Sequence, residues 1–186
     1  MLPKNKKLII FDFDQTLCNS NALVRRVDLA NGQEDFLSAG EYIDWRETGE
    51  DDSERPRWEL DFKEFDGYPN KGERIKPTFK ILEASLFDGN KIVAIVTGRD
   101  ELAGPKQWLE MCMIPTDKMI LICTGDPNKR PAYESLFNTL SPTSVELFED
   151  SIHHIEQCRD VCGKYNLPFK GFLVEAKDND YGIISF

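Results

Sequence analysis

The chain has 186 residues, which is enough for one domain with a sizeable core, and its 40% hydrophobic residues are typical of a globular protein rather than a disordered one. Its formal net charge of −10 argues against loose, non-specific binding to nucleic acid or to an anionic membrane. The cysteines are odd in number, at five, and no apolar run approaches the roughly 18 residues of a membrane helix, so we expect a cytoplasmic protein with no membrane association. No obligate protein partner is evident from the sequence.

The first predicted element is a strand at residues 7–13, KLIIFDF, whose apolar run indicates burial on both faces. Residues 18–76 follow with a different character, because acidic side chains are mixed with aromatic ones. A long insertion after a strand is usually functional, so we predict a cap-like insertion at 18–76 within a single domain that spans residues 1–186. Trp45 and Trp58 could stack on a substrate there, but we expect them to form the insertion's own core.

Beyond the insertion, helical patterns alternate with strand patterns. The helices are predicted at residues 77–88, 101–113, 131–140 and 151–165, and the strands at residues 91–97, 119–123, 145–149 and 169–176. Such alternation is typical of an α/β fold in which helices cover both faces of a parallel sheet. We therefore predict a Rossmann-like, doubly wound parallel sheet of about five strands.

The first strand runs directly into two carboxylates, Asp12 and Asp14. Residues i and i+2 of a strand point the same way, so both side chains leave the sheet on one side. Ligands of open parallel sheets bind at the carboxyl ends of the strands, and Mg²⁺ usually takes one or two carboxylates together with phosphate oxygens. The pair therefore predicts a cation site, although two aspartates could also simply cap the strand and its turn.

Three later strand ends add the other groups that phosphoryl transfer requires. These groups are Thr97, Gly98 and Arg99 after the second strand, Lys129 before the helix that follows the third strand, and Glu149 and Asp150 after the fourth. They supply further metal ligands and donors for phosphate oxygens, and the first strand end supplies a nucleophile.

In this order the motifs resemble those of the haloacid dehalogenase (HAD) superfamily of phosphohydrolases, over residues 7 to about 175. The motifs read Asp12-Phe-Asp14-Gln-Thr16, Thr97-Gly98-Arg99, Lys129 and Glu149-Asp150. The resemblance implies that Asp12 is the nucleophile and that Asp14 is the general acid and then the general base. It also implies that Mg²⁺ is held by the Asp12 carboxylate, the Asp14 backbone carbonyl and Asp150. Whether Glu149 or Asp150 is the direct ligand stays open.

The same resemblance assigns the contacts to phosphate. Thr97 and Lys129 would be catalytic residues that hold the phosphoryl oxygens. Gly98 and Arg99 would bind the substrate, although Arg99 could instead pair with a nearby acid.

These assignments predict a Mg²⁺-dependent phosphomonoester hydrolase that acts through an aspartyl-phosphate intermediate. Its partner would be a phosphorylated small molecule or a nucleic-acid 3′ end. Residues 108–137 are loosely similar to the phosphatase half of polynucleotide kinase/phosphatase enzymes, so a polynucleotide 3′-phosphatase or a nucleotidase is an alternative. A non-catalytic regulatory or binding module that retains the HAD fold is an alternative of another class. His153 or His154 could also face the active site.

Overall fold

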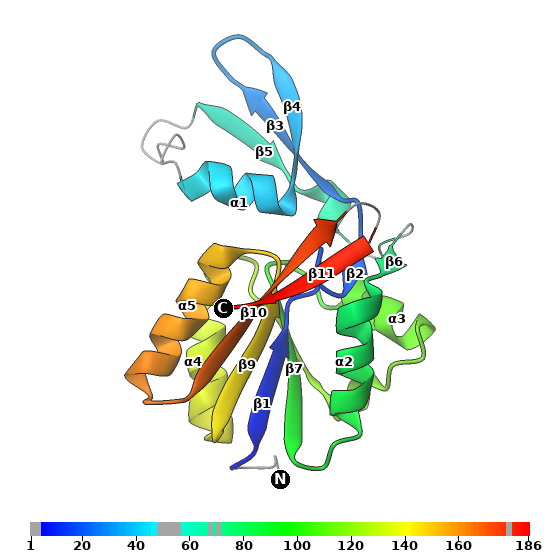
Figure 1. Cartoon of the computed structure of the whole chain (residues 1–186). Coiled ribbons are helices and arrows are strands. Elements are labelled where there is room, and N and C mark those ends of the chain that lie inside the picture. The colour runs from blue at the N-terminus through cyan, green and yellow to red at the C-terminus, as the bar shows by residue number, and fades with distance from the viewer. Residues whose placement is uncertain (1–4, 48–56, 67–68, 70–71, 178–179) are drawn as a thin grey trace.

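The structure is a computed structural model that describes residues 5–47, 57–66, 69, 72–177 and 180–186. Its centre is a six-stranded sheet in the order β11-β10-β9-β1-β7-β8 (Figure 1). In chain order its strands are β1 (Lys7–Phe11), β7 (Lys91–Thr97), β8 (Ile120–Cys123), β9 (Ser144–Glu149), β10 (Phe169–Lys177) and β11 (Asp180–Ser185). The first five are parallel, which confirms the predicted α/β fold, and β11 adds an antiparallel edge strand that we did not predict.

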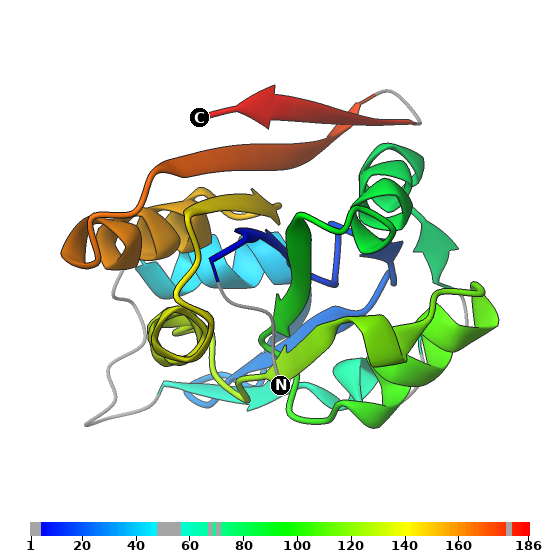
Figure 2. The ribbon, with the colours of Figure 1, turned by 90° about the horizontal axis from the view of Figure 1, so that it is seen from below.

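Four helices cover the two faces of this sheet (Figure 2). They are α2 (Lys76–Leu86), α3 (Ala103–Met111), α4 (Arg130–Leu140) and α5 (Ile152–Lys164), and a short 3₁₀ helix, η2 (Thr116–Lys118), precedes β8. Both α2 and α4 begin with a proline in the first turn, where its missing N–H costs no hydrogen bond. Within the described residues, no helix combines the length and the apolar character needed to span a bilayer.

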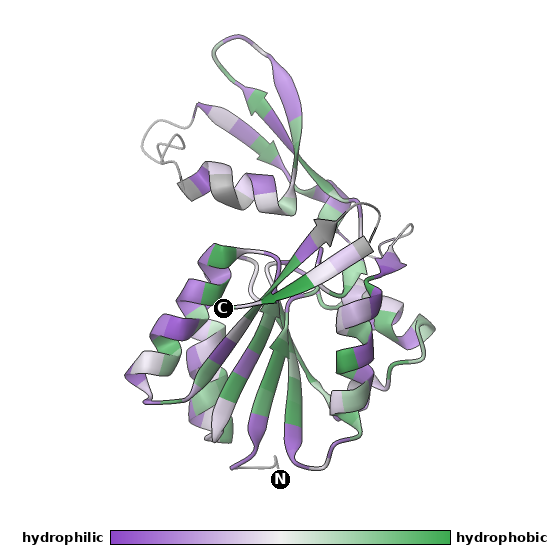
Figure 3. Ribbon diagram, in the orientation of Figure 1, coloured by the Kyte–Doolittle hydropathy of each residue, from purple (hydrophilic) through white to green (hydrophobic). Residues whose placement is uncertain are grey.

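Strand β1 explains why the sheet is buried on both sides. Leu8 and Ile10 pack in a core with α4 and α5, whereas Ile9 and Phe11 pack in a second core with α2 and α3. All four side chains are at most 1% exposed. Figure 3 shows the resulting concentration of hydrophobic residues along the central strands. Because β1 runs parallel to β7 and β9, the polar residues after Phe11 emerge at the shared carboxyl edge of the sheet.

The segment between β1 and α2 forms a separate small layer above that edge, which we call the cap (Figure 1). Its elements are β2 (Cys18–Asn19), β3 (Leu23–Asp28), β4 (Glu34–Ser38), α1 (Ala39–Glu47), β5 (Trp58–Asp61), the 3₁₀ helix η1 (Lys63–Phe65) and β6 (Glu73–Arg74). Strands β2 and β6 pair where the chain leaves and re-enters the main domain, and β4-β3-β5 form an antiparallel sheet.

The cap has a hydrophobic core of its own, which contains Val24, Tyr42 and Trp45 and against which Trp58 packs. The Arg26 guanidinium lies 4.7 Å from the ring of Trp45 and 4.3 Å from that of Trp58. These cation–π contacts help to hold the two tryptophans inside the cap. The prediction that Trp45 and Trp58 form the insertion's own core is therefore confirmed.

Candidate active site

A cavity of about 290 Å³ is lined both by cap residues and by residues at the carboxyl ends of the parallel strands. The eight residues to which the sequence assigned catalysis, metal binding or substrate binding all line this one cavity: Asp12, Asp14, Thr97, Gly98, Arg99, Lys129, Glu149 and Asp150. They come from four strand ends that are as much as 138 residues apart in the chain, from Asp12 to Asp150. The parallel sheet is what brings them together.

The turn after β1 holds the two aspartates at the floor of this cavity. The Asp12 N–H donates to the Phe148 carbonyl at 2.9 Å, which continues the pairing of β1 with β9 by one residue. The N–H groups of Leu17 and Cys18 then donate back to the Phe13 carbonyl and close a tight loop. Within this loop Asp12 and Asp14 are only 5% and 7% exposed. Both side chains are therefore largely shielded from bulk water.

Lys129 bridges the first and fourth strand ends. Its Nζ lies 2.6 Å from Asp12 Oδ1 and 2.9 Å from Glu149 Oε2, and its side chain is 2% exposed. Lys129 is the residue directly before α4, and its backbone N–H donates to Gln157 Oε1 on α5 at 3.0 Å. Two helices thus fix the position of the ammonium group.

The charges at this bridge shift one another strongly. Burial and the neighbouring Glu149 raise the pKa of the Asp12 carboxyl to about 8, with Lys129 acting in the opposite direction. Burial opposes the charge on Glu149 too, but Lys129 and His154 outweigh it and lower the pKa of that carboxyl. Burial likewise opposes the charge on Lys129, but Asp12 and Glu149 raise its pKa. Both carboxyl groups contact the Lys129 ammonium, and Glu149 loses its proton more readily than Asp12.

The same end of the sheet fits a hard divalent cation. Asp12, Glu149 and Asp150 each present a carboxylate oxygen within 4.8 Å of the other two. Burial and the neighbouring Glu149 hold the pKa of Asp150 well above its usual value. Only Asp12 and Glu149 contact the Lys129 ammonium, and a cation with oxygen ligands would compensate the negative charge that the three groups carry when all are ionised. Glu149 therefore belongs to the candidate metal site by its position. The resemblance placed Asp14 at the metal site through its backbone carbonyl only, and the Asp14 side chain is not part of this group of three.

The side chain of Asp14 is engaged elsewhere, by Arg99. The Arg99 Nε and Nη2 atoms donate to Asp14 Oδ2 and Oδ1 at 2.7 and 2.8 Å, and Ser20 Oγ donates to Asp14 Oδ1 at 2.7 Å. Arg99 Nη1 also donates to the Phe65 carbonyl of the cap at 2.5 Å. Of the two roles that the sequence allowed for Arg99, the structure thus shows pairing with an acid. Burial opposes its charge, but Asp14 outweighs burial and raises the pKa of the guanidinium.

Thr97 and Gly98 form the wall next to Arg99. Thr97 is 2% exposed at the end of β7, and its carbonyl accepts from the Thr124 N–H at 2.9 Å, so the loops after β7 and β8 are tied together. Gly98 is exposed to the cavity.

Of the two histidines that the sequence placed near the active site, His154 on α5 is buried with its Nδ1 3.2 Å from Glu149 Oε1, and it lines the cavity. His153 is absent from the described lining. Other residues of the site were not predicted from the sequence. The cap residues Tyr42, Arg46 and Phe62 also line the cavity. No local pattern distinguishes them from the other aromatic and charged residues of the insertion.

Comparison with known proteins supports the fold. Neither a protein-family model nor a curated protein matches the sequence. Among solved structures, the chain is similar to the HAD domain of the effector protein Lem4 from Legionella pneumophila, with a TM-score of 0.52 and 11% sequence identity. That similarity covers 91% of this chain and 86% of the Lem4 domain chain. At this identity the likeness concerns the fold alone, and we conclude that the protein has a HAD-like fold.

Proposed function

We propose that the protein is a Mg²⁺-dependent phosphomonoester hydrolase that forms an aspartyl-phosphate on Asp12. The observation that carries the proposal is the Lys129 ammonium, which contacts Asp12 at 2.6 Å and Glu149 at 2.9 Å on the floor of the cavity. This contact orients the Asp12 carboxylate and places a fixed positive charge where a phosphoryl group would arrive. Such preorganised charge is the main means by which phosphoryl transfer is catalysed.

The reaction would run in two steps on this chain's own groups. In the first, an oxygen of Asp12 attacks phosphorus, the bond from phosphorus to the leaving oxygen breaks, and Asp14 donates its proton to that oxygen. In the second, Asp14 accepts a proton from water while the water oxygen attacks phosphorus. The bond from phosphorus to Asp12 then breaks and inorganic phosphate leaves. Thr97 and Lys129 would hold the phosphoryl oxygens throughout.

The metal site of this proposal consists of Asp12, Asp150 and the Asp14 backbone carbonyl, with Glu149 close enough to contribute. When bound, Mg²⁺ would neutralise charge on the phosphoryl oxygens and reduce their repulsion of an anionic nucleophile. The excess of buried carboxylate over ammonium charge supports a cation here.

Phosphate release from 4-nitrophenyl phosphate, with and without Mg²⁺, tests the proposal on the wild type and on Asp12→Asn. We expect Mg²⁺-dependent turnover of the wild type and its loss in the variant. Asp117→Asn is the matched control, because Asp117 is exposed and lies outside the cavity. Intact-mass spectrometry of the stopped reaction should show one added phosphoryl group on the wild type and none on Asp12→Asn.

The same experiment decides against the alternative class, a non-catalytic regulatory or binding module. Such a module would show no Mg²⁺-dependent turnover with any phosphate ester, and Asp12→Asn would then leave its behaviour in the assay unchanged.

A further inference from the structure

The cap supplies an aromatic wall to the cavity. Tyr42 on α1, and Phe62 and Phe65 around η1, all line it, opposite the loops that carry the catalytic candidates. The rings of Tyr42 and Phe62 meet edge to face at 5.1 Å, and those of Phe62 and Phe65 lie 6.5 Å apart. Aromatic side chains arranged in this way offer faces and edges on which another flat ring can pack.

Phe62 is the informative member of this wall. It remains 39% exposed, whereas Tyr42 is 8% exposed, and Phe62 does not belong to the hydrophobic core of the cap. A large apolar side chain that is exposed towards a cavity contributes little to folding but much to the binding of an apolar partner.

The charges around the cavity limit what else the partner carries. Apart from the candidate catalytic groups and Arg99, the described charged residues that line it are Arg46, Asp66, Asp100 and Asp126, together with His154. The three aspartates outnumber the single arginine, and the Arg46 Nη1 atom already lies 3.4 Å from the Tyr42 hydroxyl. A second phosphate on the substrate would therefore meet net negative charge, and like-charge contacts of this kind discriminate strongly between ligands.

We propose that the substrate is a phosphate monoester that carries an uncharged flat ring system and no second phosphate, with the ring packed against Phe62. Nucleoside monophosphates and simple aryl phosphates share this chemistry. The inference rests on the proposed hydrolase function. It favours a small molecule over a nucleic-acid 3′ end, because a strand end would bring its next phosphodiester close to the three aspartates Asp66, Asp100 and Asp126.

Steady-state kinetics on matched esters tests the proposal. Adenosine 5′-monophosphate and ribose 5-phosphate differ in the presence of the base. Because a base that stacks on an aromatic side chain binds more tightly, kcat/KM should be about 10- to 100-fold higher for adenosine 5′-monophosphate. Adenosine 3′,5′-bisphosphate adds one phosphate, and its kcat/KM should be lower than that of adenosine 5′-monophosphate by about tenfold or more. Phenyl phosphate and adenosine 3′-monophosphate separate an aryl from a nucleoside preference, and a 3′-phosphorylated oligonucleotide tests the strand end.

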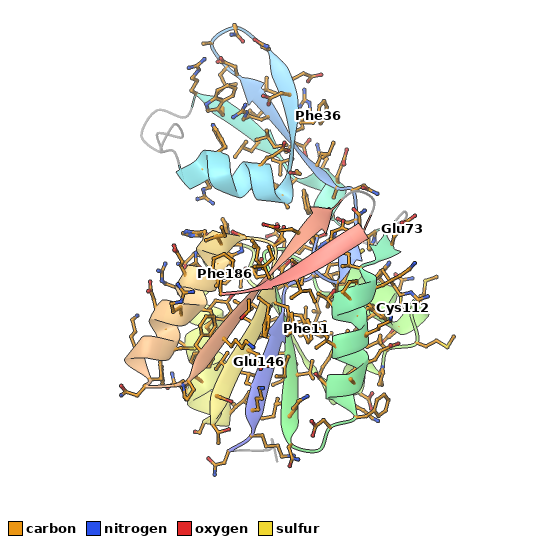
Figure 4. All side chains as sticks on the ribbon, viewed as in Figure 1. Phe11, Phe36, Glu73, Cys112, Glu146 and Phe186 are labelled. Atoms are coloured by element: carbon orange, nitrogen blue, oxygen red, sulfur yellow. The ribbon has the colours of Figure 1, made fainter. Side chains whose placement is uncertain are left out.

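Variants of Phe62 connect the preference to the wall. Phe62→Ala should reduce the ratio of kcat/KM for adenosine 5′-monophosphate to kcat/KM for ribose 5-phosphate towards one, and Phe62→Leu should recover only part of that ratio. Phe36→Ala is the matched control, because Phe36 is 50% exposed on β4 of the same cap and lies outside the cavity (Figure 4). It should leave the ratio unchanged.

Calorimetric binding to Asp12→Asn in the presence of Mg²⁺ separates the two proposals. Equal kcat/KM for the esters with and without a base overturns the aromatic preference and leaves the hydrolase. Preferential binding of the nucleoside monophosphate without turnover by the wild type overturns the hydrolase and keeps the ligand class. Absence of both turnover and preference overturns both. Faster turnover of the oligonucleotide than of the monophosphates also overturns the ligand class.

Discussion

The Arg99 guanidinium contacts both carboxylate oxygens of Asp14, at 2.7 and 2.8 Å, and the same group donates to the Phe65 carbonyl of the cap. One buried side chain therefore joins the loop after β7, the loop after β1 and the cap. The proposed general acid is held by a partner that also contacts the cap. Its orientation is thus coupled to the place of the cap above the cavity.

Arg99→Lys should lower kcat by about 10- to 100-fold while the protein stays folded. Lysine keeps the positive charge but cannot grip two carboxylate oxygens at once, so Asp14 loses its fixed orientation. The expected loss is larger for an alkyl phosphate than for 4-nitrophenyl phosphate, because only the alkyl leaving group depends on a well-placed proton. Arg25→Lys is the control, since Arg25 pairs with Glu34 at an exposed site of the cap. Equal losses for both substrates would argue for a purely structural Arg99.

Asp14→Asn should separate the two chemical steps. An amide cannot donate the proton that an alkyl leaving group needs, so alkyl phosphate hydrolysis should fall by about 10²- to 10⁴-fold. Nitrophenolate leaves without a proton, and the variant should release it in a burst of about one equivalent before it stalls as the aspartyl-phosphate. Rapid-mixing absorbance measures the burst. A uniform loss with no burst contradicts the role of Asp14 as acid and base.

The sequence predicted the five parallel strands because each is a continuous apolar run, as in KIVAIVT of β7. It did not predict β11, DYGIIS, which mixes polar residues and a glycine with its apolar ones and follows its partner β10 almost directly. The cap strands were equally hidden. In LVRRVD of β3, the charged residues obscure the alternation, and burial comes from packing within the cap.

The sequence was enough to predict which residues form the candidate site, but not which of them contact each other. Strand ends of a parallel sheet meet at one edge, so the sequence was enough to expect Asp12, Lys129 and Asp150 in one cavity. Which cation contacts which carboxylate depends on side-chain geometry across the fold. For this reason the sequence could not decide whether Arg99 binds phosphate or pairs with an acid. The position of Phe62 in the aromatic wall depends on tertiary packing, which leaves no local signal in the sequence.

Binding of Mg²⁺ should raise the stability of the folded protein. If Mg²⁺ binds the folded chain at 100 times its dissociation constant, it adds about 2.7 kcal/mol, which raises Tm by about 5–10 °C for a chain of this size. Asp150→Asn should abolish that rise. Without Mg²⁺, the variant should be more stable than the wild type by about 0.5–2 kcal/mol, because it removes the half-buried member of a crowded group of three carboxyl groups.

Differential scanning fluorimetry with Mg²⁺ or EDTA measures both effects. Asp117→Asn serves again as the control and should behave as the wild type does. A wild-type Tm that ignores Mg²⁺, or an Asp150→Asn protein that keeps the full shift, would count against the metal site.

Lys129→Met should be the most destabilising of these changes. It leaves Asp12 and Glu149 buried without their ammonium partner, and breaking a buried pair in this way costs about 3–5 kcal/mol. Lys164→Met removes a comparable contact, to Glu134 at 3.0 Å, but between exposed side chains, and should cost at most about 1 kcal/mol. Denaturant unfolding in EDTA compares the two variants. Because Mg²⁺ would replace part of the lost positive charge, its stabilising effect should be larger in Lys129→Met than in the wild type. Similar losses in the two lysine variants would mean that the Lys129 bridge contributes no more than a surface contact.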